Sequence, residues 1–460
     1  MVFEGCVRRP VEPILPYANS PEHLVPGIPV HFATVTQREG DALGLLVTSH
    51  DGRPTKVEGN PNHPASQGAT DTLAQILVNS VYDPDRSQKP AKREGGALVD
   101  ASYAEFAKAF EALIAEHRAT QGAGLRFLVQ PSTSPTFHRL RQAVRSRLPQ
   151  ARFHVYSSVN MSNAREGARI AFGRPHTALI DFEKAQVVLA LDSDFLHNEP
   201  FSTRYSRAFA KRRAVESPET QMNRLYVVEP GHSATGAAAD HRLRLPASQV
   251  GNYLLALAKV LVQKHSIPLA ALEGGLRTTP TDFPKEWLEA VADDLAANRG
   301  RAPIVVGRNQ PAWVHALAHA VNAGLGNHGQ CVRFFPAIDT NEPTDLVADL
   351  KELVEATDVK TVVIIGGNPV YDAPADFDFA GFLGREGLTS VHFSSHRDET
   401  SQLATWHCPL ANELESWGDL LAVDGTYSIQ QPLIAPLYDG WSPLQVLAVA
   451  ADRKESPYEL

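Results

Sequence analysis

Short apolar runs that alternate with polar or helix-length stretches constrain the fold of this chain more than any other feature. Four runs lie at residues 125–129, 153–156, 187–191 and 225–228, and four more at 303–306, 332–335, 361–365 and 389–393. Brief apolar runs separated by helical sequence are typical of buried strands in a parallel sheet. The sequence therefore predicts an α/β protein with two Rossmann-like halves, each built on a parallel sheet.

The segments around these runs set the predicted domain boundaries. Residues 1–30 contain closely spaced prolines that prevent helix formation and favour an extended arm: Pro10, Pro13, Pro16, Pro21, Pro26 and Pro29. Residues 31–96 are predicted to form a small β unit and a linker, because Leu43, Leu45 and Val47 alternate before a turn at residues 50–52. The first α/β region is expected at residues 97–265 and the second at residues 266–460.

Composition excludes several classes of function. The chain has 460 residues, of which 21% are charged, and a formal net charge of -9, so no overall positive field attracts nucleic acid. No apolar run reaches the roughly 18 residues that a membrane-spanning helix needs. The three cysteines, Cys6, Cys331 and Cys408, are too few for the thiolates of an all-cysteine iron–sulfur cubane. Cys6 is either an ordinary cysteine or the acylated residue of a lipoprotein signal.

Three loops that follow predicted strands contain residue types that nucleotide sites use. In chain order they contain Asp192 and Ser193, then Glu229 and Gly231, then Gly366, Gly367 and Asn368. In open α/β sheets, ligands bind at the carboxyl ends of strands, where glycines let backbone amides approach phosphates. The same residue types also make ordinary strand-to-helix turns, which explain each loop taken singly.

Two groups of histidines and one group of basic residues allow two interpretations each. His315 and His319 have a spacing that can bind a metal ion on a helix, but no third ligand accompanies them, which favours packed or solvated histidines. A second group could also bind a metal, with structural roles as the favoured alternative: His392, His396, His407 and Cys408. Basic residues on one predicted helix form either a solvated face or a surface for an acidic partner: Arg204, Arg207, Lys211, Arg212 and Arg213.

The segment at residues 51–68, DGRPTKVEGNPNHPASQG, resembles the entry segment of the molybdopterin oxidoreductase superfamily. In that superfamily a cysteine cluster beside this segment usually holds a 4Fe–4S centre, but the neighbouring predicted strands carry no cysteine here. The three loops described above match, in order, the superfamily loops that cradle a pterin dinucleotide. The resemblance spans roughly residues 30 to 430. It implies the superfamily fold, with the C-terminal β domain absent.

Three departures from the superfamily pattern disfavour a bound pterin. Asp192 replaces a glycine and brings a carboxylate to the position of a diphosphate. Gly231 replaces an arginine, which removes a positive partner for an anionic cofactor. Asn160 falls where many members hold the metal through cysteine or selenocysteine, and its neutral amide is a poor ligand. No catalytic residue, cofactor or metal is therefore expected in this chain, and six positions are vestiges of pterin loops: Asp192, Ser193, Glu229, Gly366, Gly367 and Asn368.

Longer strings resemble one branch of the superfamily, the B subunit of alternative complex III, a membrane-bound quinol oxidoreductase. They include residues 9–16, 65–71, 82–87, 398–400, 415–419 and 431–437. This resemblance implies a pterin-free scaffold that docks a ferredoxin-like iron–sulfur domain, a multihaem cytochrome and integral membrane subunits in respiratory electron transfer. The iron–sulfur clusters and haem are then expected in those partners. It also implies a periplasmic position on the outer face of the membrane, after export by a signal that this chain lacks.

Two other functions stay open at the level of the sequence. One is a catalytically active molybdopterin oxidoreductase of polysulfide or tetrathionate reductase type, which would contain stoichiometric molybdenum or tungsten. The other is a free-standing α/β binding protein, which would be a stable monomer without partners in a membrane complex. Under the scaffold hypothesis, this chain is part of an oxidoreductase complex and is not an enzyme by itself.

Overall fold

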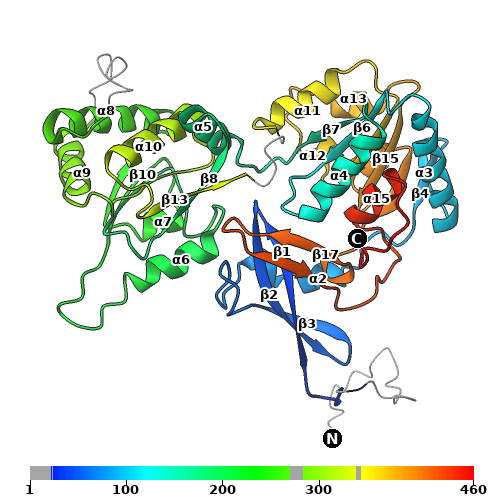
Figure 1. The fold of residues 1–460 in the computed structure, drawn as a ribbon, viewed down its shortest axis with the longest axis horizontal. Coiled ribbons are helices and arrows are strands. Elements are labelled where there is room, and N and C mark those ends of the chain that lie inside the picture. The colour runs from blue at the N-terminus through cyan, green and yellow to red at the C-terminus, as the bar shows by residue number, and fades with distance from the viewer. Residues whose placement is uncertain (1–21, 23, 270–282, 338–342) are drawn as a thin grey trace, which may run out of the picture.

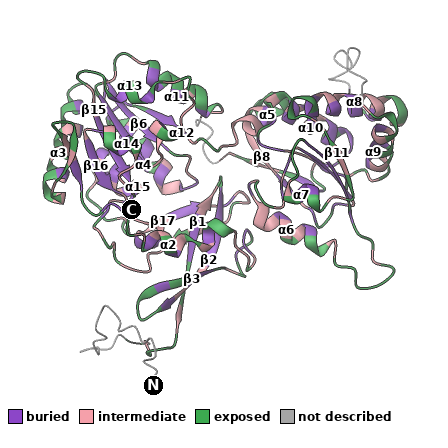
Figure 2. Ribbon diagram, turned by 180° about the vertical axis from the view of Figure 1, so that it is seen from behind, coloured by how far each residue is buried: buried purple, intermediate pink, exposed green. Residues whose placement is uncertain are grey.

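Two α/β lobes and a small β unit make up the described part of the chain (Figure 1). The computed structural model describes residue 22 and residues 24–269, 283–337 and 343–460, so the predicted arm at residues 1–30 lies almost wholly outside it. The sheets of both lobes are buried, while the outer faces of many covering helices are exposed (Figure 2). The predicted α/β class is confirmed.

The larger lobe is built on a mixed sheet. Among the described residues its seven strands lie in the order β5 (Ala97–Asp100), β4 (Ala91–Glu94), β16 (Trp406–Pro409), β15 (Thr389–Ser394), β14 (Thr361–Ile365), β6 (Leu125–Val129) and β7 (Arg152–Val155). Strand residues alternate between two cores. Phe127 and Val363 face α3 (Tyr103–Arg118), α4 (Pro135–Arg147) and α15 (Pro443–Ala450), whereas Leu128 and Ile364 face α11 (Leu346–Glu355) and α13 (Phe379–Leu383).

The smaller lobe contains a parallel sheet with helices on both faces. In the described chain its order is β11 (His241–Arg244), β10 (Arg224–Glu229), β9 (Val187–Leu191) and β12 (Ile304–Val306). One face packs on α8 (Ala247–His265), α9 (Lys285–Ala297) and α10 (Ala312–Gly324), and the other on Phe182, Phe195 and α6 (Ser202–Lys211). An antiparallel ribbon of β8 (His176–Ile180) and β13 (Val332–Pro336) adjoins it, beside α5 (Ser162–Phe172).

The assignment of strands to the two regions, 97–265 and 266–460, was wrong. Strands β6 and β7 pair with β14 in the larger sheet, and β12 pairs with β9 in the smaller one. Strand β13 is antiparallel to β8, and the predicted linker before residue 96 supplies β4 to the larger sheet. The smaller lobe is thus inserted into the larger one. Apolar runs identify strands but carry no information on which distant strand each one pairs with.

The structure contains the small β unit that was predicted, with an antiparallel sheet as its central part. Strands β1 (Val30–Arg38), β2 (Asp41–His50) and β3 (Arg53–Gly59) form an antiparallel sheet that packs on α1 (Thr72–Gln75) and α2 (Leu77–Val81). Asp51 and Gly52 have φ values of 50° and 79°, which confirms the predicted turn, and Glu39 and Gly40 make a similar one. Near this second turn, Gln37 donates to the Pro131 carbonyl of the larger lobe. The tip of the β1–β2 hairpin therefore reaches the lobes.

Side-chain caps fix where several helices begin. Ser102 accepts the amide hydrogen of Glu105 before α3, and Ser134 and Asp345 cap α4 and α11 in the same way. Within the described residues, the helices are all too short or too polar to cross a membrane.

Candidate functional site

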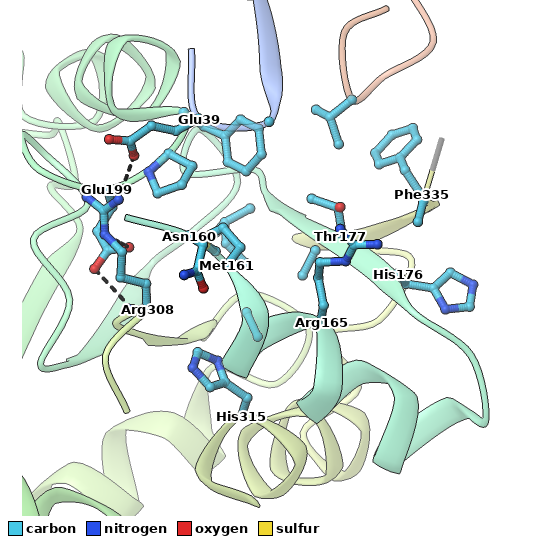
Figure 3. A pocket seen from close by; sticks show the side chains of 18 of the residues that line it. Glu39, Asn160, Met161, Arg165, His176, Thr177, Glu199, Arg308, His315 and Phe335 are labelled. Atoms are coloured by element: carbon cyan, nitrogen blue, oxygen red, sulfur yellow. Dashed lines mark hydrogen bonds and ion pairs between the residues drawn. The ribbon is translucent and has the colours of Figure 1, made fainter. Parts of the chain in front are cut away.

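A cavity of about 780 Å³ lies where the two lobes meet the tip of the β1–β2 hairpin. Gln130 and Ser157 line it from loops after β6 and β7, and Ser193 and Arg308 line it from loops after β9 and β12. Carboxyl ends of strands from both sheets therefore face one space, which is where α/β proteins bind ligands. Figure 3 shows this cavity, with Glu39 of the hairpin tip and His315 of α10 on opposite sides.

Asp192 gives the loop after β9 a turn typical of glycine but adds a carboxylate. Its backbone φ is 52°, in the left-handed region that glycine favours and aspartate tolerates. Gln310 Nε2 donates to the Asp192 carboxylate at 2.7 Å, and burial raises the pKa of this carboxyl group. Ser193, the next residue, is buried and lines the cavity. The loop is thus held by protein groups.

Gly307 makes this loop sensitive to a single added methyl group. A Cβ on Gly307 would lie 1.7 Å from the Asp192 carbonyl oxygen. We expect Gly307→Ala to lower the free energy of unfolding by about 1–3 kcal/mol, because backbone has to move. Gly231→Ala is the control: nothing lies within 4 Å of a Cβ there, so its effect should stay under about 0.5 kcal/mol. Chemical denaturation measures both, and equal effects would contradict the steric argument.

Glu229 lies at the end of β10, where neighbouring side chains donate hydrogen bonds to its carboxylate. Arg242 Nε donates to its Oε1 at 2.6 Å, and the Ser233 hydroxyl donates to its Oε2 at 2.6 Å. A Cβ on Gly236 would lie 1.8 Å from Oε1, so α7 (Ala234–Ala237) packs directly against this carboxylate. The buried Glu229 side chain therefore takes the donors that an anionic ligand at this strand end would need.

The Gly366 loop is tied to the helix that follows β15. Gly366 and Gly367 have φ values of 71° and 74°, so this turn requires glycine. Asn368 Oδ1 accepts hydrogen bonds from the backbone amide and hydroxyl of Thr400 in α14 (Glu399–Leu403), and Asn368 Nδ2 donates to Glu399 at 2.6 Å. Turn chemistry and helix attachment account for these three residues.

The structure does not bring the six predicted loop positions together around the cavity. Of that set, Ser193 is the one that the described residues place in the lining. Asn160, the position expected to correspond to the metal ligand, does line the cavity just before α5. Its Nδ2 donates to the Ser157 carbonyl at 2.8 Å, and its Oδ1 accepts from the Ser162 amide at 3.0 Å. Both polar atoms of the Asn160 side chain therefore form hydrogen bonds within the turn before α5.

Glu199 is a cavity residue that the sequence patterns did not indicate. The Arg308 guanidinium donates to Glu39 at 2.7 Å and lies 3.8 Å from Glu199, whose carboxylate also accepts the Arg308 amide hydrogen (Figure 3). Burial raises the pKa of Glu199 to about 7, although Arg308 opposes this shift. One arginine thus lies between two carboxylates that come from distant parts of the chain, so sequence spacing gives no signal for this arrangement.

His315 and His319 also line the cavity, from successive turns of α10. Burial lowers the pKa of His315 to about 4 and that of His319 to about 3, so both imidazoles are neutral at neutral pH. Phe172 and Phe334 lie with ring centroids 5.2 and 5.5 Å from that of His319. In the described parts of the chain, no three potential ligands are placed to hold a metal ion. The favoured interpretation, packed histidines, agrees with these contacts.

His392 and His407 belong to a buried hydrogen-bond chain. His392 Nε2 lies 3.0 Å from the Gly367 carbonyl, so this nitrogen carries the proton and Nδ1 accepts from Ser401 at 2.8 Å. Ser401 also contacts His407 Nδ1 at 2.9 Å, and His407 Nε2 meets Ser87 at 2.5 Å. These bonds support the structural role that was favoured for this group, and they fasten the Gly366 loop to the sheet.

Acidic residues of the same chain pair with most of the basic group, which lies on α6 and directly after it. Arg204 lies 2.9 Å from Asp424 and 4.0 Å from Asp41 of β2, and thus joins the smaller lobe to the β unit. Two further pairs are Lys211 with Glu183 and Arg213 with Asp240, and Arg207 donates to the Gln67 carbonyl. Arg212 is partly buried. The group therefore serves intramolecular contacts.

Two of the three cysteines are described, and both are buried free thiols. Burial raises the pKa of the Cys331 thiol to about 12 and that of Cys408 well above its usual value. Buried thiols with raised pKa values are chemically inert. Cys6, with its possible lipid attachment, lies outside the described residues.

The sequence and the structure of this chain were compared with those of known proteins. No family model matches the chain. The menaquinone reductase molybdopterin-binding-like subunit of Nitratidesulfovibrio vulgaris is 24% identical over 453 residues, which cover 90% of this chain and 64% of that protein. A probable oxidoreductase of Bacillus subtilis, YyaE, is 38% identical over 74 residues, or 16% of this chain. The chain thus spans less than two thirds of the length of either curated relative.

A solved structure has the same fold over most of the chain. Acetylene hydratase from Pelobacter acetylenicus matches with a TM-score of 0.68 and 13% sequence identity, covering 92% of this chain and 67% of that one. The fold predicted from the resemblance is therefore confirmed. Together, this fold and the sequence match to the molybdopterin-binding-like subunit support a molybdopterin oxidoreductase-like relationship.

Proposed function

We propose that this chain is a pterin-free structural subunit of a respiratory quinone oxidoreductase complex. The relative from N. vulgaris is named as a molybdopterin-binding-like subunit of a menaquinone reductase, and its similarity extends over 90% of this chain. That name supports membership in a complex of several subunits that exchanges electrons with a quinone. The narrower assignment to an alternative complex III rests on the resemblance of the strings at residues 82–87 and 415–419.

The carboxylates at the strand ends are the observation that carries the pterin-free part of the proposal. A pterin dinucleotide is anionic through its diphosphate, and such a group needs amides or cations at these loops. Asp192 and Glu229 are there instead, close enough for the Glu229 charge to raise the Asp192 pKa further after burial. Arg242, which could attract an anion, is paired with Glu229. These residues do not fit a group that carries two phosphates.

Ion pairs between distant parts of the chain support the proposed scaffold role. Ion pairs hold the lobes and the β unit together, as Arg204 and Arg308 illustrate. A rigid frame of this kind suits a subunit that positions other redox carriers. We propose that it docks an iron–sulfur domain and a multihaem cytochrome at the periplasmic face of the membrane, with clusters and haem in those partners and membrane contact through integral subunits.

Metal and pterin analysis of the intact complex tests this proposal. The complex is purified through a tag on this chain, and its molybdenum, tungsten and releasable pterin are measured per chain. We expect all three to be far below one per chain, with iron–sulfur and haem subunits co-purifying. Stoichiometric metal and pterin would instead support an active oxidoreductase of polysulfide or tetrathionate reductase type. A monomer that co-purifies with no membrane subunit would point to a free-standing binding protein.

A further inference from the structure

We propose that the open edge of strand β18 (Tyr427–Gln430) docks an extended segment of a partner subunit, which adds a strand beside it. Strand β18 forms an antiparallel hairpin with β17 (Gly418–Leu421), and this hairpin, in orange in Figure 1, lies next to β1. The assignment of this surface rests on the docking role proposed above. It is carried by unpaired backbone groups, by exposed apolar side chains and by a comparison with other strand edges of the chain.

Tyr427 and Ile429 point their backbone amides and carbonyls away from β17. In an antiparallel pair, opposite residues alternate between pairs that exchange hydrogen bonds and pairs whose backbone groups point outward. Leu421, which lies opposite Tyr427, donates its amide hydrogen outward to the Thr133 carbonyl at 3.1 Å. Tyr427 is therefore in an outward pair, and so is Ile429, two residues further along and opposite Asp419. Among the described residues, neither Tyr427 nor Ile429 has a partner for these backbone groups.

The side chains on this edge are apolar and exposed. Tyr427 and Ile429 are 56% and 59% exposed, and they share one face of the hairpin because they lie two residues apart in a strand. The Tyr427 hydroxyl donates to Asp419 at 3.2 Å, which holds the ring across β17. Strand β18, with the sequence YSIQ, contains no charged residue. A segment that pairs here therefore contacts this face with apolar side chains, while its extended backbone meets the unpaired amides and carbonyls.

Two other edge strands have outward backbone groups that side chains of the same chain bind. At β12, which ends the smaller sheet, the Ile304 amide donates to Asn322 Oδ1 at 3.0 Å, and Asn322 Nδ2 donates to the Ile304 carbonyl at 2.9 Å. At β7, which ends the larger sheet, the Val155 amide donates to the Asp349 carboxylate at 2.6 Å. Polar side chains thus cover these edges, which prevents pairing with another strand.

Charged side chains protect the opposite edge of the larger sheet. Strand β5 ends in Asp100, and it pairs with β4, which contains Lys92, Arg93 and Glu94. Charges at an edge disfavour a further strand, because that strand would bury them. Compared with β5, β7 and β12, strand β18 has neither a side chain that binds its outward backbone groups nor a charge. An edge without such protection is typical of a strand that pairs with another chain.

Hydrogen–deuterium exchange of the β18 amides tests the proposal. Exchange is compared between the isolated full chain and the complex purified through a tag on this chain. In the isolated chain the amides of Tyr427 and Ile429 should exchange fast, because they have no acceptor, whereas the Ser428 and Gln430 amides, which face β17, should exchange more slowly. In the complex we expect exchange at Tyr427 and Ile429 to slow at least about tenfold, with a smaller change at Ser428 and Gln430.

Ile429→Pro is the variant that tests the edge directly. Proline removes an amide hydrogen that has no partner in the hairpin and hinders the addition of a strand, while the bonds to β17 stay. We expect the amount of partner subunit per tagged chain to fall at least about tenfold. Leu98→Pro is the control, because the register of β5 also points the Leu98 amide outward, at an edge with charged neighbours. It should leave the amount of partner subunit unchanged.

The exchange measurement on the unaltered chain keeps the proposal testable if Ile429→Pro fails to fold. Redox subunits that co-purify while Tyr427 and Ile429 exchange equally fast with and without them would overturn the β18 site and leave the proposed scaffold role in place. Exchange that is slow in the isolated chain only at high concentration would identify a second copy of this chain as the occupant and refute the partner subunit. Slow exchange in the isolated chain at every concentration would show that the chain covers this edge itself, which also refutes it. A tagged chain that co-purifies with no partner would overturn both the proposed function and this docking site.

Discussion

Glu415→Ala is expected to lower the free energy of unfolding by about 3–5 kcal/mol. Glu415 and Arg86 form a bidentate ion pair with nitrogen–oxygen distances of 3.0 and 2.7 Å, and their side chains are 0% and 3% exposed. Burial raises the pKa of the Glu415 carboxyl, but hydrogen bonds from Arg86, Asn412 and Leu437 together hold it below its usual value. Removing the carboxylate leaves the Arg86 guanidinium buried without its counter-charge.

Equilibrium urea denaturation measures this loss, and an exposed pair provides the control. Arg152 and Glu352 lie 2.9 Å apart with side chains that are 62% and 58% exposed, so Glu352→Ala should cost no more than about 0.5 kcal/mol. The double variant Arg86→Met with Glu415→Leu should recover part of the loss, because neither charge is then buried. The prediction fails if Glu415→Ala is as stable as Glu352→Ala.

The same ion pair explains two strings that carried the family resemblance. Residues 82–87 follow the β unit, and residues 415–419 come after β16 of the larger sheet, yet Arg86 and Glu415 meet in the folded chain. Ser87, the next residue, contacts His407 of the larger sheet at 2.5 Å. These strings therefore join the β unit to the larger lobe. Their role in the structure is packing and pairing.

Sequence periodicity predicted the strands of this fold but not how they assemble. The runs at Leu125–Val129 and Thr361–Ile365 became β6 and β14 at the predicted residues, because each buries both faces of the strand. Their pairing joins segments more than two hundred residues apart, and it depends on the insertion of the whole smaller lobe between them. That insertion leaves no trace in local composition.

Site residues could be predicted from the sequence where the local backbone conformation requires a particular residue type. Gly366 and Gly367 have the positive φ values that a glycine turn requires, and Asp192 keeps such a φ value without the glycine. Glu199 was missed because its partners Arg308 and Glu39 lie in other parts of the chain. Long-range electrostatics of this kind follows from the tertiary fold and not from spacing.

Acidification from pH 7 to pH 5.5 is expected to lower the free energy of unfolding by a net amount of about 2 kcal/mol from four buried groups. Burial lowers the pKa of His315 to about 4, and the pKa values of His319 and His407 to about 3, from an ordinary value of 6.5. Below pH 6.5 the unfolded chain binds these protons and the folded chain does not. The three histidines together therefore cost about 4 kcal/mol over this interval.

Glu199 acts in the opposite direction and provides the decisive variant. Its folded pKa of about 7 exceeds the ordinary 4.5, so below pH 7 the folded chain binds a proton that the unfolded chain does not, which contributes about 2 kcal/mol at pH 5.5. Glu199→Gln removes this contribution and leaves the histidines. We expect its free energy of unfolding, measured in urea, to fall between pH 7 and 5.5 by about 2 kcal/mol more than that of the unaltered chain.

Other buried groups also change protonation on acidification, in both directions. Burial also lowers the pKa values of His63, His117 and His392, which adds to the loss, and it raises those of Asp41 and Glu413, which opposes the loss as these carboxyls become protonated. They contribute equally to the unaltered chain and to Glu199→Gln, so the difference between the two pH dependences isolates Glu199. Identical pH dependences would show that the Glu199 carboxyl ionises in the folded cavity as it does in water, and that Arg308 fully compensates its burial.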